Sequence, residues 1–344
     1  PASPQIFHGR ESELQDLVNT LLAEPARVAI LGPGGMGKTT LAVAALHSPQ
    51  VVDKYPTRHF IPCDSAQAND ALVATIASHL GLEASQGSAK YIVHHLTMQP
   101  PCMLVLDNFE TPWEPLDGRA KVEEFLSLLT DVPHVALLIT IRGAERPSKV
   151  QWTHPFLHPL SPLSSSAAHQ IFIEIADEIH DGSEVDKLLE ITDNIPLAVQ
   201  LVADMAASEG CQATLERWKI ESTALFSAGY DKQSNLEISI QLSLSSPRLT
   251  YLPHAADLLS LMSLLSDGIS DIDLIQSKPP IPEILKCKST LVRTSLAYAD
   301  HAGRLKVLAP IRDYMQISRP PSPHLVRPLR KYFISLIELW RTSL

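Results

Sequence analysis

The chain has 344 residues, of which 45% are hydrophobic and 19% charged, and its formal net charge is −10. This composition excludes an intrinsically disordered chain, and the length predicts two or three domains. The acidic balance disfavours nucleic acid as a main partner, although a local basic patch can still exist.

Cysteine usage and hydropathy indicate the compartment. The four cysteines, Cys63, Cys102, Cys211 and Cys287, are far apart and form no C-x-x-C pair, which predicts reduced thiols in a cytoplasmic protein. No apolar run reaches the roughly 18 residues of a membrane span, and no signal-peptide pattern opens the chain. Because the chain begins at Pro1 rather than at Met, we expect it to be a piece of a longer protein.

Strands and helices alternate in the first part of the chain. Helical periods cover residues 11–22, 39–47, 70–80, 89–96 and 122–129, and apolar runs predict strands over 27–31, 59–62, 102–107, 135–141 and 156–159. This alternation predicts an α/β domain over residues 1–160, with a parallel sheet and helices on both faces.

The rest of the chain is predicted to be mainly helical. Helical periods cover residues 165–179, 184–191, 197–207, 215–226, 236–244, 258–265, 271–275 and 329–340. Two short strands, 291–293 and 305–308, flank the turn at 300–303, and helices followed by such a hairpin indicate a winged-helix shape. We therefore divide this part into a small all-helical domain (161–230), a winged-helix-like domain (231–318) and a proline-rich linker with a terminal helix (319–344).

A glycine-rich loop lies between the first strand and the helix that follows it. Its residues are Gly32-Pro33-Gly34-Gly35-Met36-Gly37-Lys38-Thr39-Thr40, which fit the phosphate-binding pattern G-x-x-x-x-G-K-[ST]. Glycines let backbone N–H groups turn towards phosphates, and the helix N-terminus adds a positive dipole end. Lys38 is expected to reach the β- and γ-phosphates and the Thr39 hydroxyl to hold Mg²⁺. The alternative is a degenerate loop without a ligand, against which the intact Lys38 and Thr39 argue.

Acidic and basic residues follow the next two apolar strands. Asp107 ends the strand 102–107, where α/β sheets place ligand-contacting residues, and it is the expected carboxylate for Mg²⁺. Glu110 is a weaker candidate for orienting a water, because Asn108 stands where many active ATPases carry a second acid. Arg142 ends the strand 135–141 and is expected to contact the γ-phosphate, unless it is a surface arginine paired with Glu145 or another acid.

These motifs together resemble the STAND class of P-loop NTPases, in particular its NB-ARC type, and look most like versions from fungal multidomain proteins. The resemblance rests on the order of five segments, Phe7-His8-Gly9-Arg10-Glu11, Gly34-Gly35-Met36-Gly37-Lys38-Thr39-Thr40, Leu104-Val105-Leu106-Asp107-Asn108, Leu138-Ile139-Thr140-Ile141-Arg142 and Asn194-Ile195-Pro196-Leu197-Ala198. The family implies a nucleotide-binding, a helical and a winged-helix domain, with ADP bound in a closed state and ATP in an open, self-associating state. It also implies partners bound through flanking domains that are missing here.

The resemblance carries further site residues with it. It implies that Phe7, Gly9 and Arg10 lie near the adenine or ribose, and that Pro196 packs near the adenine, although Pro196 also suits a plain helix start. One departure concerns the family's M-H-D histidine, because Leu308 stands at its place and cannot contact a phosphate. The terminal helix 329–340 either packs on the winged-helix-like domain, begins a repeat array, or attaches to a membrane.

Three functions remain in competition at this level. The favoured one is an ATP/ADP-dependent signalling switch with slow hydrolysis, of the kind found in NOD-like proteins of immunity or cell death. The second is an ordinary P-loop ATPase or kinase, and the third is a nucleotide-controlled, DNA-binding transcription regulator. Adenine is favoured over guanine, because no N-K-x-D motif follows the strand 135–141.

Overall fold

The computed structural model of the protein describes residues 1–83, 88–177, 181–221, 240–241, 243–294, 296–300 and 302–342. Its internal contacts divide the chain into two compact units, Pro1–Ile171 and Phe172–Leu344. The boundary falls inside helix α8 (Ser165–Ala176) rather than at residue 160. The first turn of α8 belongs to the first unit, because Ala167 packs against Gly9 so closely that a Cβ on Gly9 would lie 2.3 Å from the Ala167 Cβ.

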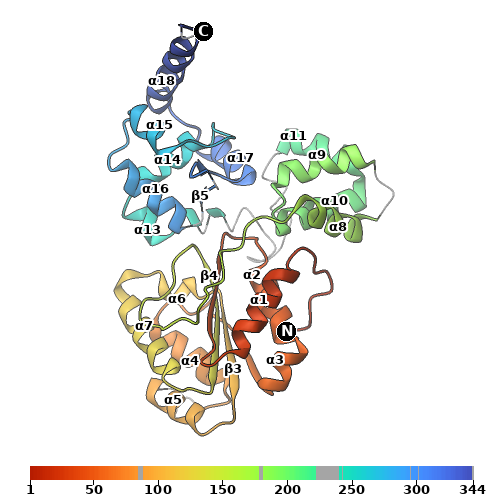
Figure 1. The fold of residues 1–344 in the computed structure, drawn as a ribbon, viewed down its shortest axis with the longest axis vertical. Coiled ribbons are helices and arrows are strands. Elements are labelled where there is room, and N and C mark those ends of the chain that lie inside the picture. The colour runs from red at the N-terminus through yellow and green to blue at the C-terminus, as the bar shows by residue number, and fades with distance from the viewer. Residues whose placement is uncertain are drawn as a thin grey trace. The chain divides into compact units, whose positions relative to one another are not determined.

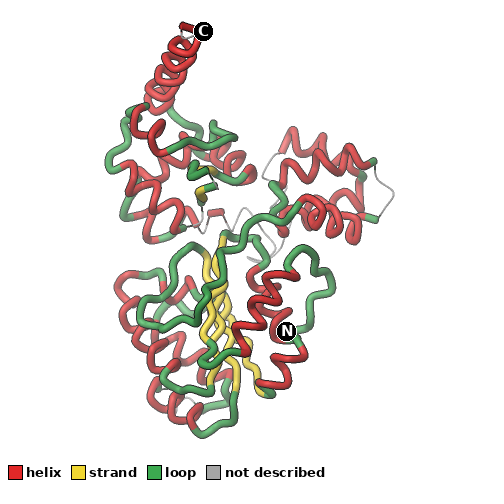
Figure 2. The backbone as a smooth tube through the Cα atoms, viewed as in Figure 1, coloured by secondary structure: helices red, strands yellow, loops and turns green. Residues whose placement is uncertain are grey.

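The first unit is a layered α/β structure built on one parallel sheet of strand order β1-β4-β3-β2 (Figures 1 and 2). Its elements are α1 (Glu11–Leu22), β1 (Arg27–Gly32), α2 (Lys38–Leu46), α3 (Pro49–Lys54), β2 (Thr57–Pro62), α4 (Asn69–His79), α5 (Ala89–Thr97), β3 (Cys102–Asp107), α6 (Glu110–Trp113), α7 (Leu116–Thr130) and β4 (Val135–Arg142). The predicted parallel sheet is thus confirmed; the short helices α3 and α6 had no counterpart in the predicted elements.

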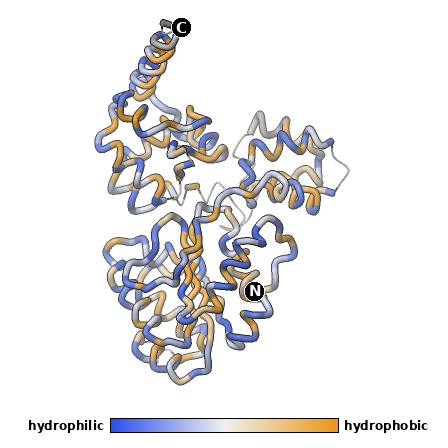
Figure 3. The backbone as a smooth tube through the Cα atoms, viewed as in Figure 1, coloured by the Kyte–Doolittle hydropathy of each residue, from blue (hydrophilic) through white to orange (hydrophobic). Residues whose placement is uncertain are grey.

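Burial explains why these segments form strands and helices. The strands β3 and β4 are almost continuously apolar and buried along their length, as expected when helices cover both faces of a parallel sheet. Figure 3 shows the hydrophobic residues gathered on the strands between the two helical layers. One face packs against α4, α5 and α7, whereas α1 and α2 contact β1 and β4. Since all strands are parallel, the residues at their carboxyl ends lie along one edge of the sheet.

The predicted strand over residues 156–159 is wrong. This segment follows the outer edge of β1 as a loop, and only its flanks bond to the strand: Thr153 N–H donates to the Arg27 carbonyl at 3.0 Å and Leu160 N–H to the Leu31 carbonyl at 2.8 Å. Between them, Pro155 and Pro159 have no N–H to donate, so a regular ladder cannot form.

The second unit is helical with one small hairpin. Its elements after α8 are α9 (Gly182–Thr192), α10 (Pro196–Glu209), α11 (Cys211–Glu221), α13 (Pro247–Thr250), α14 (His254–Met262), α15 (Asp271–Gln276), α16 (Ile284–Arg293), β5 (Tyr298–Ala299), β6 (Leu305–Lys306), α17 (Ala309–Ser318) and α18 (Pro323–Thr342). The predicted helix 236–244 and the end of the helix 215–226 lie largely outside the described residues. Among the helices of the described ranges, none is both long enough and apolar enough to cross a membrane.

Two predictions for the second unit are wrong in their element type or bounds. Residues 291–293 belong to α16 rather than to a strand, because Cys287 and Leu291 lie one turn apart on its buried face. The hairpin is formed instead by β5 and β6. The proline-rich segment is also shorter than predicted, since α18 begins at Pro323 and continues through Pro328, with Leu325 and Leu329 buried one turn apart.

Candidate nucleotide-binding site

The glycine-rich loop leaves the buried strand β1 at Gly32 and enters α2 at Lys38. Gly37 precedes the helix in the left-handed region (φ 81°), which side chains other than glycine rarely adopt. Gly32 is constrained by space, because a Cβ there would lie 3.0 Å from the Leu160 carbonyl oxygen. Within the loop, Met36 buries its side chain and thus presents only backbone. The loop 32–37 therefore has the strand–turn–helix setting that a phosphate-binding loop requires.

Lys38 carries the buried cation of this loop. Its ammonium donates to the carbonyl oxygens of Gly32 at 2.9 Å and Pro33 at 2.6 Å, and the residue is 9% exposed. Burial lowers the pKa of Lys38 to about 8, against the opposing attraction of the Glu110 and Asp107 carboxylates. These carboxylates act on Lys38 although Asp107 is 69 residues away in sequence, so the structure brings three of the predicted site residues together.

Asp107 is fully buried at the end of β3, and its carboxylate accepts hydrogen bonds from two hydroxyl groups. Thr39 Oγ1 lies 2.9 Å and 3.1 Å from its two carboxylate oxygens, and Thr140 Oγ1 donates to Oδ1 at 2.6 Å. Burial raises the pKa of Asp107, and the two threonine hydroxyls and Lys38 counteract that rise. The Thr39–Asp107 pairing is the arrangement predicted for a Mg²⁺ site.

Thr140 is a site residue that our sequence reasoning missed. It lies on β4, is fully buried, and also accepts a hydrogen bond from the Asn108 N–H at 3.0 Å. Asn108 itself follows Asp107 in the left-handed region (φ 55°), which asparagine tolerates better than most residues. The available signal was a lone hydroxyl in the apolar strand Leu138-Ile139-Thr140-Ile141, since buried polar groups in such strands need a partner.

The oxygen donors at this edge fit a magnesium ion. A carboxylate and a hydroxyl are hard oxygen ligands of the type that Mg²⁺ prefers alongside phosphate oxygens and water. Asp107 and Thr39 already lie within hydrogen-bond distance of each other, so one cation can neutralise the buried carboxylate and use the hydroxyl. The donor chemistry therefore agrees with the predicted ligands.

Arg142 pairs with Glu110. Its Nε lies 3.7 Å from Glu110 Oε1, and its backbone N–H donates to Glu110 Oε2 at 3.1 Å. Glu110 begins the short helix α6, and both side chains are only 15–16% exposed. Glu145 lies 3.6 Å from Arg119. Pairing of Arg142 with an acid is therefore confirmed for Glu110, and its contact with a γ-phosphate stays a prediction.

The residues ahead of α1 lie next to the same loop. Arg10 is 6% exposed; its guanidinium contacts the Met36 carbonyl at 3.5 Å, the Ser161 carbonyl, and Glu13 at 2.7 Å. Phe7 is partly exposed, and Gly9 packs on Ala167. Arg10 is thus adjacent to the loop, and its role towards an adenine or ribose stays a prediction.

Comparison with known families identifies this arrangement. The family model of the novel STAND NTPase 1 matches residues 1–173, which is just over half of the chain and contains every site residue described above. The chain belongs to the novel STAND NTPase 1 family. The STAND class that the motifs indicate is therefore confirmed.

Two groups of known proteins resemble this STAND NTPase. Uncharacterized proteins of Mycobacterium tuberculosis and Mycobacterium bovis are each 29% identical to it over 210 residues, 57% of this chain and 50% of the relative. The chain thus spans about half the length of the curated relatives it matches.

The second group consists of solved archaeal structures. A Walker-type ATPase of Pyrococcus abyssi has a TM-score of 0.65 at 15% identity, covering 91% of this chain and 97% of its own. The ORC2 protein of Aeropyrum pernix (TM-score 0.54, 14% identity, 98% and 97% covered) and its ORC1 protein in complex with DNA (0.51, 13%, 94% and 95%) are also similar. At these identities the likeness concerns the fold, and it agrees with an α/β P-loop NTPase domain.

Two positions that the resemblance singles out, Pro196 and Leu308, belong to the second unit of this STAND NTPase. Pro196 is the first residue of α10, so its role as a helix start is confirmed, and its contact with adenine stays a prediction. Leu308 precedes α17 and is buried. Next to it, the Ala309 N–H donates to the Asp193 carboxylate at 2.5 Å. Where the family has the M-H-D histidine, this chain therefore has the N-terminus of α17, hydrogen-bonded to the Asp193 carboxylate.

Proposed function

We propose that this STAND NTPase is an ATP- and ADP-binding molecular switch of the NB-ARC type that works in signalling. The observation that carries this proposal is the convergence of Lys38, Asp107, Glu110 and Arg142 on the carboxyl edge of one sheet. These groups belong to three different segments, and two of them are cationic and two anionic. Such a set binds a polyphosphate and distinguishes the number of its phosphates electrostatically.

The loop, Lys38, Thr39 and Asp107 hold the nucleotide in this proposal. Backbone N–H groups of residues 32–37 and the α2 N-terminus surround the phosphates, while the Lys38 ammonium leaves its two carbonyl partners for phosphate oxygens. Thr39 and Asp107 hold Mg²⁺, which neutralises phosphate charge when bound. Thr140 keeps the Asp107 carboxylate oriented towards Thr39.

Arg142 distinguishes ATP from ADP. A γ-phosphate competes with the Glu110 carboxylate for the Arg142 guanidinium, because both are anions and the Arg142–Glu110 distance of 3.7 Å is longer than a tight ion pair. ADP leaves the Arg142–Glu110 pair intact. The two nucleotides thus stabilise two arrangements of α6 and the end of β4, which is the differential affinity that a switch requires.

Hydrolysis is expected to be slow. Glu110 is paired with Arg142, and both its carboxylate oxygens already face Arg142 groups. Asn108 occupies the place of a second acid and cannot accept a proton from water. A long-lived ATP state suits a switch that signals through the second unit and self-associates when ATP is bound.

Nucleotide content and assembly test this proposal. Denaturing the purified chain and identifying the released nucleotide by chromatography is expected to yield ADP. Light scattering after size exclusion is then expected to show a larger particle with Mg²⁺ and ATPγS than with ADP. Turnover of many ATP molecules per second, with the same particle size in both nucleotides, would support an ordinary ATPase instead.

Nucleotide-controlled DNA binding is a second candidate. The likeness to an ORC1 protein solved in complex with DNA favours it, as does the hairpin β5–β6 following α16, which is the order of a winged helix. Against it, basic side chains here are paired: Lys288 with Asp271, Lys286 with Glu283 and Lys306 with Asp300. A salt-dependent mobility shift with duplex DNA would favour this candidate.

A further inference from the structure

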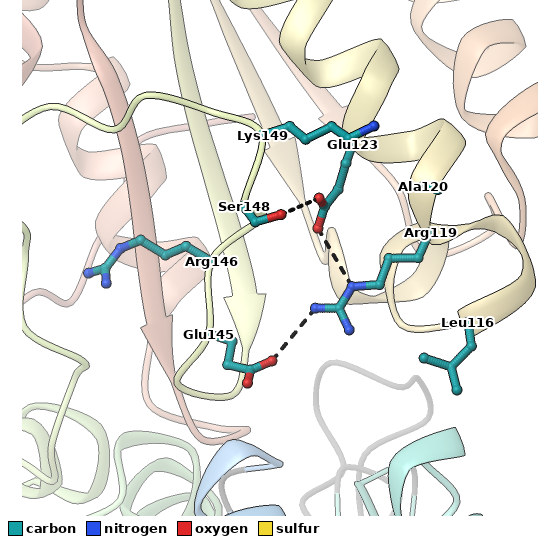
Figure 4. A pocket seen from close by; sticks show the side chains of 8 residues that line it. All are labelled: Leu116, Arg119, Ala120, Glu123, Glu145, Arg146, Ser148 and Lys149. Atoms are coloured by element: carbon teal, nitrogen blue, oxygen red, sulfur yellow. Dashed lines mark hydrogen bonds and ion pairs between the residues drawn. The ribbon is translucent and has the colours of Figure 1, made fainter.

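A second buried carboxylate, Glu123 on α7, lies outside the nucleotide site. Its Oε1 accepts a hydrogen bond from the Trp113 indole N–H at 2.9 Å, and its Oε2 accepts one from the Ser148 hydroxyl at 2.6 Å. Arg119 Nε lies 3.6 Å from Oε1 (Figure 4). Glu123 is 6% exposed. One carboxylate thus joins α6, α7 and the loop that follows β4.

The hydrogen bonds of Glu123 favour its charged form. They lower its pKa below the ordinary glutamate value, even though burial alone would raise it. A buried acid that stays ionised is costly unless its partners are fixed in place. Glu123 therefore holds Trp113 and Ser148 at fixed distances from α7.

Two short chain segments connect these partners to the Arg142–Glu110 pair. Trp113 ends the four-residue helix α6 that begins at Glu110. Ser148 lies six residues after Arg142 in the loop that follows β4, and the start of this loop is tied to Gly32 by the paired hydrogen bonds of Gly143 (3.1 Å and 3.3 Å). Both members of the pair are thus anchored, a few residues away, by the same carboxylate.

We propose that Glu123 is a positioning residue for the nucleotide sensor, which sets how readily the Arg142 guanidinium exchanges Glu110 for a γ-phosphate. This inference rests on the proposed function, because it assumes that Arg142 reads the γ-phosphate. Glu123 touches neither Arg142 nor Glu110 directly. It acts by holding α6 and the loop 143–148 at one separation.

The neighbouring ion pairs contribute less to this positioning. Arg119 stacks on Trp113, 3.9 Å from the ring centroid, and pairs with both Glu123 and Glu145. Arg119 and Glu145 line an open cavity of about 610 Å³, and their side chains are 25% and 31% exposed. Solvent screens such pairs, so the two hydrogen bonds from Trp113 and Ser148 dominate.

The test compares affinities for MgATPγS and MgADP by calorimetry on the full chain. Glu123→Ala is expected to lower the ATPγS-to-ADP affinity ratio by about tenfold, since hydrogen bonds to a charged group are strong. Glu123→Gln, which keeps the shape, is expected to retain most of the ratio, and Ser148→Ala to lose part of it. Glu124→Ala, at the exposed neighbour on the same helix, is the matched control.

A double-mutant cycle separates positioning from mere destabilisation. If Glu123 acts through Arg142, adding Glu123→Ala to Arg142→Gln lowers the ratio no further, while ADP affinity stays near wild type. A purely structural role would weaken both nucleotides equally and leave the ratio unchanged in Glu123→Ala and Ser148→Ala. That result would overturn the inference. If Arg142→Gln leaves the ATPγS-to-ADP affinity ratio at its wild-type value, the proposed function is overturned instead.

Discussion

The two units of the chain carry their charges in different ways. In the first unit, Lys38, Asp107 and Glu123 are buried and hydrogen-bonded, Lys38 within its own loop and the two carboxylates by residues from distant segments. In the second unit, the pairs are partly or largely exposed, such as Lys286–Glu283 with side chains 66% and 57% exposed. Buried charges need fixed partners, whereas exposed pairs contribute little to stability. This difference agrees with the proposal that the nucleotide chemistry lies in the first unit.

The largest expected effect comes from Lys38. Lys38→Ala removes the only buried ammonium of the described residues in the phosphate loop, and we expect ATPγS and ADP to bind at least about 100-fold more weakly. The melting temperature without nucleotide is expected to stay close to wild type. Calorimetry measures the affinities, with Lys90→Ala, at an exposed lysine of α5, as the control. Unchanged affinity in Lys38→Ala would remove the basis for the nucleotide site.

Thr140→Val tests whether the buried carboxylate depends on its missed partner. The change keeps the side-chain shape but removes the 2.6 Å hydrogen bond to Asp107 Oδ1, which then accepts only from Thr39, so we expect a loss of about 1–2 kcal/mol in stability. The Mg²⁺-dependence of ATPγS binding is expected to weaken as well. Denaturant titration and calorimetry measure both, and Thr75→Val on α4 is the control, since Thr75 bonds only its own helix. Wild-type stability in both variants would show that Thr140 is dispensable.

Asp193→Ala tests the strongest polar contact described at the start of α17. Loss of a carboxylate that accepts the Ala309 N–H resembles the loss of a helix cap, which costs about 1 kcal/mol. Faster hydrogen exchange at Ala309 is the expected observation, while ADP affinity serves as the second readout. Asp186→Ala, at an exposed position of α9, is the control. Equal exchange in the two variants would mean that the contact contributes nothing.

The smallest effect is expected for Lys286→Ala. Its pair with Glu283 at 2.7 Å is exposed and screened by solvent, so we expect no resolvable change in the free energy of unfolding and none in nucleotide affinity. A thermal-shift assay and the same calorimetry suffice. A clear change in nucleotide affinity would break the contrast between the two units, because it would give the second unit a direct part in binding.

Local patterns predicted the features of the fold that are local. The strands β1, β3 and β4 and the phosphate loop follow from apolar runs and from glycine spacing, and so does the meeting of Asp107 with Thr39. The failures have physical reasons. Pro155 and Pro159 lack the N–H groups that a strand over residues 156–159 would need to pair with β1. The run Leu291-Val292-Arg293 resembles a strand only when Cys287, one helical turn earlier, is ignored.

Other contacts between polar groups far apart in sequence, which belong to no motif, were not predictable in this way. Thr140 meets Asp107 across 33 residues, and Ser148 meets Glu123 across 25. A hydroxyl or carboxylate shows its type in the sequence but not its partner, which depends on the register of two strands and on a loop path. Sequence reasoning therefore located the strand ends and missed the side chains that hold them in place.

Arg10 connects the phosphate loop to the segment that leads into α8. Its guanidinium bonds the carbonyl of Met36, inside the loop, and that of Ser161, in the connector that enters α8. Because the guanidinium is a rigid planar fork, a displacement of one carbonyl cannot be absorbed by the other bond. A movement of the loop at Met36 would therefore reach the connector at Ser161 through a single side chain.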